Sequence, residues 1–139
     1  MYKTYSCIVC NTESRFKHSK LNLYCSIACQ QSKKTADLIK NWLSGGDKSI
    51  WKYSIPAWAK KYLIDTRGYQ CEICGGKTHM KKAIPLEVDH IDGNSQDNRL
   101  ENLRLICPNC HSQTESFKGA NRGKGRHQRR VRYNQGKSS

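Results

Sequence analysis

Eight cysteines fall into four close pairs, and this spacing constrains the fold more than any other feature of the chain. The pairs are Cys7/Cys10, Cys71/Cys74 and Cys107/Cys110, each with two residues between them, and Cys25/Cys29, with three. Such close pairs are typical of zinc ligands and are poor candidates for disulfides. Only 36% of the 139 residues are hydrophobic, so we expect bound metal, rather than a large apolar core, to hold the fold together.

The first two pairs predict an N-terminal zinc finger over residues 1–34. The expected ligands of its structural zinc ion are Cys7, Cys10, Cys25 and Cys29. The first pair would share a tight turn, and the second pair would lie one turn apart on one helix face, with Ser26 as the N-cap. A short hairpin is expected within residues 11–23. A knuckle, a hairpin and ligands at a helix start resemble a treble-clef zinc finger; the alternative is a loose arm with free thiols.

The middle of the chain predicts helices. Residues 35–43 have a short amphipathic pattern that ends at Ser44-Gly45-Gly46, and glycine is favoured where a helix stops. A second helix is expected to start near Pro56, because proline suits the first helical position, and to end at Gly68. We therefore divide this region into a helical linker, residues 35–55, and the start of a domain that spans residues 56–117. Trp42, Trp51 and Trp58 are expected to pack in a core rather than to stack on bases.

The third and fourth cysteine pairs predict a second structural zinc site. Its expected ligands are Cys71, Cys74, Cys107 and Cys110, with 32 residues between the two pairs. Two such knuckles that meet at one ion supply four thiolates and leave no open coordination position. This zinc ion would therefore stabilise the fold and take no part in chemistry.

A different metal is indicated beside this zinc site. His111 follows Cys110 directly, and neighbouring residues on a helix point about 100° apart. Asp89 is the natural partner of His111, since a carboxylate and an imidazole with open positions suit Mg²⁺, Mn²⁺ or another divalent ion. His90 then remains available as a general base, a role that imidazole fills near neutral pH. Because consecutive strand residues point to opposite faces, the strand must end near His90, and the turn-forming Asp92-Gly93-Asn94 favours this.

These residues resemble the HNH endonucleases, a family with a ββα-metal fold that is common in phages and bacteria. The resemblance is densest over residues 71–117, where strands over 86–88 and 103–106 and a helix from Pro108 to about Phe117 would complete the fold. It implies that the ion is bound by Asp89 and His111 and that His90 activates water. It also implies that Asn102 orients the loop or the base, although Asn98 is a competing candidate. The expected fold is thus a small α+β protein with a zinc-stabilised HNH domain after a zinc finger and a short helical segment.

Charge is distributed unevenly along the chain and indicates DNA as the partner. The net charge is +14, yet residues 71–117 carry −2 while the flanking segments are basic, and residues 118–139 carry +8. We expect this last segment to be a flexible arm that binds nucleic acid. The resemblance implies hydrolysis of DNA to 5′-phosphate and 3′-hydroxyl ends. We also expect the metal ion and the nearby Arg104 to neutralise charge on the phosphate in the transition state.

Two alternatives remain open at this level: a non-catalytic zinc-finger protein that binds nucleic acid, and an enzyme that cuts RNA. No apolar run resembles a signal peptide or a membrane span, so an intracellular protein is expected. The pattern does not indicate the oligomeric state, the target sequence, or whether one or both strands are cut.

Overall fold

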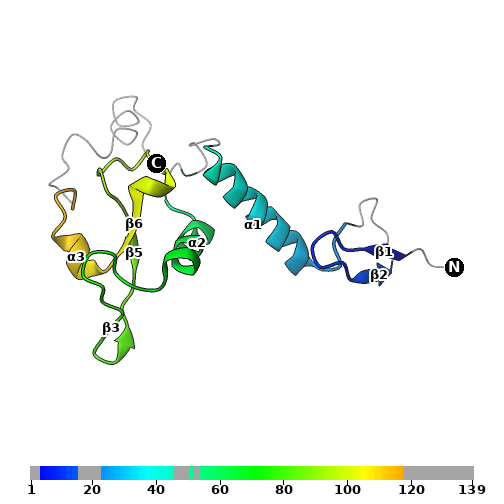
Figure 1. Cartoon of the computed structure of the whole chain (residues 1–139), viewed down its shortest axis with the longest axis horizontal. Helices are drawn as coiled ribbons and strands as arrows, with labels where there is room; N and C mark the ends of the chain where they lie inside the picture. The colour runs from blue at the N-terminus through cyan, green and yellow to red at the C-terminus, as the bar shows by residue number, and fades with distance from the viewer. Residues whose placement is uncertain (1–3, 16–22, 46–50, 52–53, 118–139) are drawn as a thin grey trace, which may run out of the picture. The chain divides into compact units, whose positions relative to one another are not determined.

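The computed structural model describes residues 4–15, 23–45, 51 and 54–117. The chain divides into two compact units, Met1–Ser44 and Gly45–Ser139, and each is considered by itself. Both combine short antiparallel strands with helices (Figure 1), which confirms the predicted small α+β fold. None of the helices in these residues is long and apolar enough to cross a membrane.

The first unit is built around a hairpin and one long helix. Strands β1 (Thr4–Ser6) and β2 (Glu13–Arg15) pair antiparallel, and the cysteine turn of residues 7–10 connects them. Helix α1 (Ile27–Leu43) follows. The hairpin therefore encloses the cysteine turn instead of lying wholly within residues 11–23 as predicted, part of which lies outside the described residues.

Helix α1 joins the helix start predicted at Ser26 to the helix predicted over residues 35–43. The Ser26 hydroxyl accepts a hydrogen bond of 3.2 Å from the backbone N–H of Cys29, which confirms the predicted N-cap. Nothing in the polar segment after Cys29 breaks the helix, so the ligand-bearing turn and the amphipathic segment form one element. The helix ends at Leu43, before Gly45 with its positive φ of 78°, where the sequence predicted the stop.

In the second unit, helix α2 (Ala57–Arg67) has the predicted ends. Pro56 is its N-cap, and Gly68 closes its last turn with φ 88° and an N–H that donates to the Ile64 carbonyl at 2.9 Å. Arg67, at the end of the helix, donates to the Leu103 carbonyl at 2.7 Å and to the Leu100 carbonyl at 2.9 Å. These bonds fix α2 against the strand that follows residue 102.

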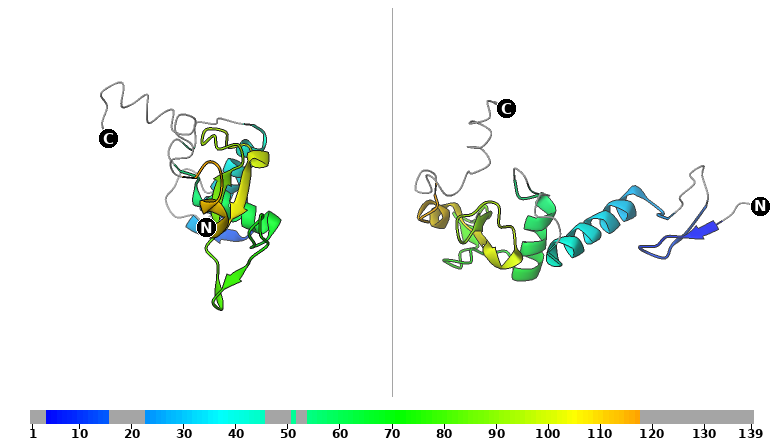
Figure 2. Two further views of the ribbon diagram at one scale, coloured as in Figure 1. Left: turned by 90° about the vertical axis from the view of Figure 1, so that its left-hand side faces the viewer. Right: turned by 90° about the horizontal axis from the view of Figure 1, so that it is seen from above.

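Two hairpins and a short helix complete the second unit. Strands β3 (Thr78–His79) and β4 (Lys82–Ala83) form one hairpin, which projects from the rest of the unit in two views (Figures 1 and 2). Strands β5 (Glu87–His90) and β6 (Leu103–Ile106) form the other. The 3₁₀ helix η2 (Leu100–Asn102) leads into β6, and α3 (Pro108–Ser112) leaves it.

The β5–β6 sheet lies between α3 and α2 (Figures 1 and 2). Its apolar side chains form the core of the unit with those of α2. The buried residues of this core include Ala59, Leu63, Leu86, Leu103, Leu105 and Ile106. Trp51 is 8% exposed and packs edge-on against Trp58 with ring centroids 5.7 Å apart, so these two tryptophans pack as predicted.

Helix α3 ends at Ser112 instead of continuing to about Phe117. Immediately after it, the Thr114 hydroxyl donates to the His111 carbonyl at 2.9 Å. Threonine side chains that bond to nearby backbone groups compete with helical hydrogen bonds, which explains the early stop. Phe117 then packs edge-on against the His111 ring at a centroid distance of 5.3 Å.

Candidate metal centres and active site

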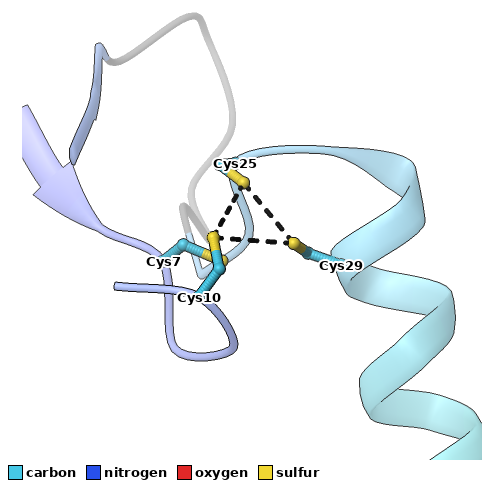
Figure 3. A group of neighbouring side chains, drawn as sticks. All are labelled: Cys7, Cys10, Cys25 and Cys29. Atoms are coloured by element: carbon cyan, nitrogen blue, oxygen red, sulfur yellow. Dashed lines mark hydrogen bonds between the residues drawn. The ribbon is translucent and has the colours of Figure 1, made fainter. Parts of the chain in front are cut away.

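The four cysteines of the first unit converge from the hairpin turn and from the start of α1 (Figure 3). Their sulfur atoms all lie within 4.8 Å of one another. The separation is 3.5 Å for Cys10–Cys25, 3.5 Å for Cys25–Cys29 and 3.8 Å for Cys10–Cys29. A tetrahedral zinc ion with Zn–S bonds of about 2.3 Å requires sulfurs about 3.8 Å apart, so this group fits zinc.

The acidity of these thiols differs with their surroundings. Backbone N–H groups, that of Cys10 first and that of Cys25 next, lower the pKa of Cys7 to about 6. The neighbouring sulfurs of Cys10 and Cys29 raise the pKa of Cys25 to about 12. Crowded thiolates repel one another, and a bound cation would relieve that repulsion and favour the thiolate form.

The second unit contains an equivalent group. The sulfurs of Cys71, Cys74, Cys107 and Cys110 also lie within 4.8 Å of one another. The Sγ atoms of Cys74 and Cys107 are 3.9 Å apart, again near the value for tetrahedral zinc. Burial raises the pKa of Cys71, but the backbone N–H groups of Cys74 and Cys107 outweigh it and bring the pKa to about 6. Both predicted cysteine groups are therefore assembled with a donor set suited to structural zinc.

Asp89 lies on β5 and is only 6% exposed. Asp89 and Arg104 are directly opposite each other in the β5–β6 ladder, and two guanidinium nitrogens of Arg104 contact Oδ2 of Asp89, Nε at 2.8 Å and Nη2 at 2.7 Å. Arg104 thus pairs with the carboxylate, a contact that the sequence did not predict. The reason is the strand register, which places opposite charges on one face of the sheet.

The second carboxylate oxygen of Asp89 faces His111. The distance from Asp89 Oδ1 to Nε2 of His111 is 3.8 Å, so one ion between them could be bound by both atoms. The other ring nitrogen of His111, Nδ1, is hydrogen-bonded to Oε2 of Glu87. Because α3 turns the side chains of consecutive residues apart, Cys110 belongs to the cysteine group while His111 points toward β5.

His90 is the last residue of β5, and its neighbour in the loop is Asn98. Nε2 of His90 lies 2.8 Å from Oδ1 of Asn98, and Asn98 is only 6% exposed. The chain turns directly after the strand, where the N–H of Gly93 donates to the His90 carbonyl at 2.9 Å. The strand therefore ends where the turn-forming sequence indicated.

Asn102 contacts the loop between β5 and β6. Its Nδ2 donates to Oδ1 of Asp92 at 2.8 Å and to the Asp97 carbonyl at 2.9 Å. Its Oδ1 accepts from the Asp92 N–H at 3.2 Å, and its carbonyl accepts from the N–H of Ile91 at 2.8 Å. This amide fastens the two ends of the loop between β5 and β6 to each other.

Sequence reasoning missed one residue of this site, Glu87. A signal was present, because Glu87 lies two residues before Asp89 and residues at that spacing share a strand face. Recognising it required the position of α3, which brings His111 to the same face.

Comparisons with known proteins agree with this geometry. Residues 71–117 match the profile of the family described as HNH endonuclease. A segment of 56 residues is 46% identical to the H-N-H endonuclease F-TflIV of Escherichia phage T5 and covers 40% of this chain. The aligned part spans only 25% of that phage protein. No solved structure matches the chain.

The matched segment contains the second cysteine group, the β5–β6 hairpin and α3, together with Asp89, His90 and His111. The region from Cys71 to Phe117 is therefore a domain of the HNH endonuclease family.

Proposed function

We propose that the chain is a metal-dependent endonuclease that hydrolyses phosphodiester bonds in DNA. The observation that carries this proposal is the pairing of Asp89 and His111, whose Oδ1 and Nε2 atoms lie 3.8 Å apart on a domain of a nuclease family. A carboxylate oxygen and an imidazole nitrogen form a donor set for Mg²⁺, Mn²⁺ or another divalent ion. When bound, such an ion would polarise the scissile phosphate and stabilise the leaving oxygen.

Each side chain then has a defined task. His90 takes a proton from the attacking water. Asp89 and His111 hold the ion, and Arg104 keeps the Asp89 carboxylate in place through Oδ2. Asn102 maintains the loop that carries Asn98 toward His90. The two cysteine groups bind zinc and stabilise their units.

The substrate is proposed to be DNA because of the family and the charge of the chain. The net charge is +14, of which residues 118–139 carry +8, and basic segments bind the phosphate backbone without reading its sequence. That last segment lies outside the described residues, so this part of the proposal rests on composition alone.

The test is cleavage of supercoiled plasmid by the full chain with Mg²⁺, with Mn²⁺ or with a chelator. His90→Ala should lower the cleavage rate by about 10²–10⁴-fold and leave plasmid retention in a gel unchanged. His79→Ala is the matched control, because His79 is an exposed histidine on β3 and its loss should not alter the rate.

Three results would contradict the proposal. Cutting at the wild-type rate by His90→Ala would exclude that residue as the base. Salt-sensitive retention without cutting, unchanged in Asp89→Ala and His111→Ala, would indicate a binding protein. Faster cleavage of a single-stranded RNA than of DNA would indicate that RNA is the substrate.

A further inference from the structure

We propose that the β3–β4 hairpin, with the residues that flank it (77–84), is an arm that binds duplex DNA. Lys77, Lys81 and Lys82 contact phosphates of the backbone, and Met80 at the tip makes an apolar contact in a groove. The inference rests on the proposed nuclease function and names a surface of the HNH domain that holds the substrate.

The arm carries most of the positive charge of this domain. Residues 71–117 contain five lysine and arginine residues, and three of them fall within six positions: Lys77, Lys81 and Lys82. The other two, Arg99 and Arg104, are each paired with an aspartate, whereas the three lysines are exposed and form no ion pair with a described residue. The seven acidic residues of the same segment lie outside the arm, so within this domain the arm is the surface suited to a phosphate backbone.

The strands of the arm do not contribute to the core. Every residue from 77 to 83 is exposed, and β3 and β4 have two residues each. The hairpin projects from the rest of the unit in two views (Figures 1 and 2). A two-stranded hairpin is at best marginally stable by itself. Packing within the unit therefore does not account for the arm or for the side chains that it presents.

The tip of the arm presents two long side chains at an energetic cost. Met80 and Lys81 form the turn between the strands, and both have positive φ, 48° and 62°. Turns of this kind favour asparagine and glycine, because a longer side chain is strained there. Met80 is 83% exposed, more than any other large hydrophobic residue of the described part of the chain. Backbone strain is concentrated at functional sites, so we place the contact with the partner at this tip.

The base of the arm is held against the second cysteine group. The N–H of Ile84 donates to the Lys77 carbonyl at 2.9 Å, and the Tyr69 hydroxyl donates to the Ile84 carbonyl at 2.6 Å. A Cβ at Gly76 would lie 3.3 Å from Sγ of Cys74, so the chain leaves the cysteine turn in close contact with it. An arm that is held in this way loses little conformational entropy when it binds.

The register of the strands places Lys77 and Lys82 on one face of the arm. Thr78 and Ala83 are directly opposite each other, and the lysines next to them in the chain point to the other face. With Lys81 at the tip, the cations are spread along a narrow ribbon. A two-stranded ribbon fits the major groove of B-DNA, whereas the deep groove of duplex RNA is too narrow for it. This geometry favours duplex DNA as the partner.

The test is the salt dependence of binding of the full zinc-loaded chain to a fluorescent DNA duplex, measured by anisotropy without added Mg²⁺ or Mn²⁺. The triple variant Lys77→Gln/Lys81→Gln/Lys82→Gln should make the slope of log K against log[salt] shallower by about three, because each lost phosphate contact changes it by about one. Arginine at the same three positions retains the charge and should restore the slope.

Lys82→Gln alone should change the slope by about one. Lys61→Gln is its matched control, because Lys61 is an exposed lysine of the same unit that is already paired with Asp65 at 2.9 Å; its loss should leave the slope unchanged. Native mass spectrometry should show the same zinc content in every variant, which separates loss of contact from loss of fold.

Met80→Ala should weaken binding at least about fivefold through loss of apolar burial and should leave the salt slope unchanged. Met80→Leu retains an apolar side chain of similar size and should restore the affinity. Ile73→Ala is the matched control, because Ile73 is 51% exposed in the same unit but lies outside the arm.

The inference is overturned if the triple lysine variant has the wild-type slope, or if it loses affinity for single-stranded RNA while it keeps that for duplex DNA. Wild-type affinity in Met80→Ala would exclude the apolar contact at the tip. Failure of the nuclease proposal looks different: the slopes respond as stated, while the wild-type protein cuts no nucleic acid.

Discussion

Asp89 and Arg104 form the ion pair on which the candidate site depends. The carboxylate is 6% exposed and the guanidinium 23%, so water solvates Asp89 poorly and Arg104 supplies its counter-charge. A buried pair of this kind adds little net stability, but removing one partner leaves the other charge uncompensated. Arg104 therefore compensates the charge of the Asp89 carboxylate inside the fold.

Arg104→Met should lower the free energy of unfolding by about 3–5 kcal/mol, because the Asp89 charge remains buried. Urea denaturation of the zinc-loaded protein measures this. Arg99→Met is the matched control, since Arg99 is 55% exposed and pairs with Asp97 at the surface; its cost should not exceed about 1 kcal/mol. The double variant Asp89→Asn/Arg104→Met should recover part of the loss, and a loss equal to or greater than that of Arg104→Met alone would show that the arginine acts through packing.

The roles of two asparagines, Asn98 and Asn102, could not be distinguished from the sequence. The sequence singled out Asn98 and Asn102 but did not distinguish them, because both lie in the polar stretch between the predicted strands. The structure gives them different contacts: Asn98 lies against His90, and Asn102 bonds to Asp92 and Asp97. Only the path of the loop, which depends on the pairing of β5 with β6, separates these contacts.

At the scale of elements, helix ends were predictable where the backbone itself requires a particular residue. Gly68 has φ 88° and Gly45 has φ 78°, a left-handed conformation that side chains with a Cβ adopt only with strain. The helix start predicted at Ser26 and the helix predicted over residues 35–43 form one element, α1. Helix α3 stopped earlier than predicted, because its end depends on the side-chain bond of Thr114. The second helix, by contrast, has both of its predicted ends.

Gly68→Ala should destabilise the second unit by about 1–2 kcal/mol through backbone strain. A Cβ at this position would meet no atom within 4 Å, so the change isolates the cost of the conformation from any clash. Thermal unfolding of the zinc-loaded protein measures the effect. Gly68→Asn is the comparison: with ψ at 161° the residue lies in a region that is essentially restricted to glycine, so asparagine should cost about as much as alanine. A negligible cost for either substitution would contradict the explanation.

At the scale of the whole molecule, each of the two units has its own cysteine group. The first group brings together cysteines from the β1–β2 hairpin and the start of α1, and the second brings together cysteines from the turn of residues 71–74 and the start of α3. Because zinc binding supplies folding free energy to small domains, loss of one ion should affect one unit.

Cys10→Ser and Cys74→Ser should each reduce the zinc content, seen by native mass spectrometry, from two ions to one. Hydrogen exchange should then show loss of protection within residues 27–43 for Cys10→Ser and within residues 57–67 and 103–112 for Cys74→Ser. The reason is that each substitution removes a thiolate from one closed site and leaves the other site complete.

The wild-type protein with both ions bound is the reference for this comparison. If either substitution exposed both units equally, the two cysteine groups would not be independent. If Cys10→Ser retained two zinc ions, the assignment of the first group would be wrong.

The sequence by itself determined the two groups of cysteines, the small α+β fold and the likeness of residues 71–117 to a nuclease family. The spacing of the cysteines allows only a few backbone geometries in a short chain, and the chemistry of the ligands limits which ion fits them. The ligand groups and the type of ion can therefore be predicted from the sequence. The tertiary structure alone decided that Arg104 pairs with Asp89, that Glu87 contacts His111 and that Asn98 contacts His90. These contacts join residues 8 to 24 positions apart, and they depend on strand register and on where α3 and the loop return to the sheet. Local sequence patterns do not encode these contacts, because the contacts follow from the packing of the whole unit.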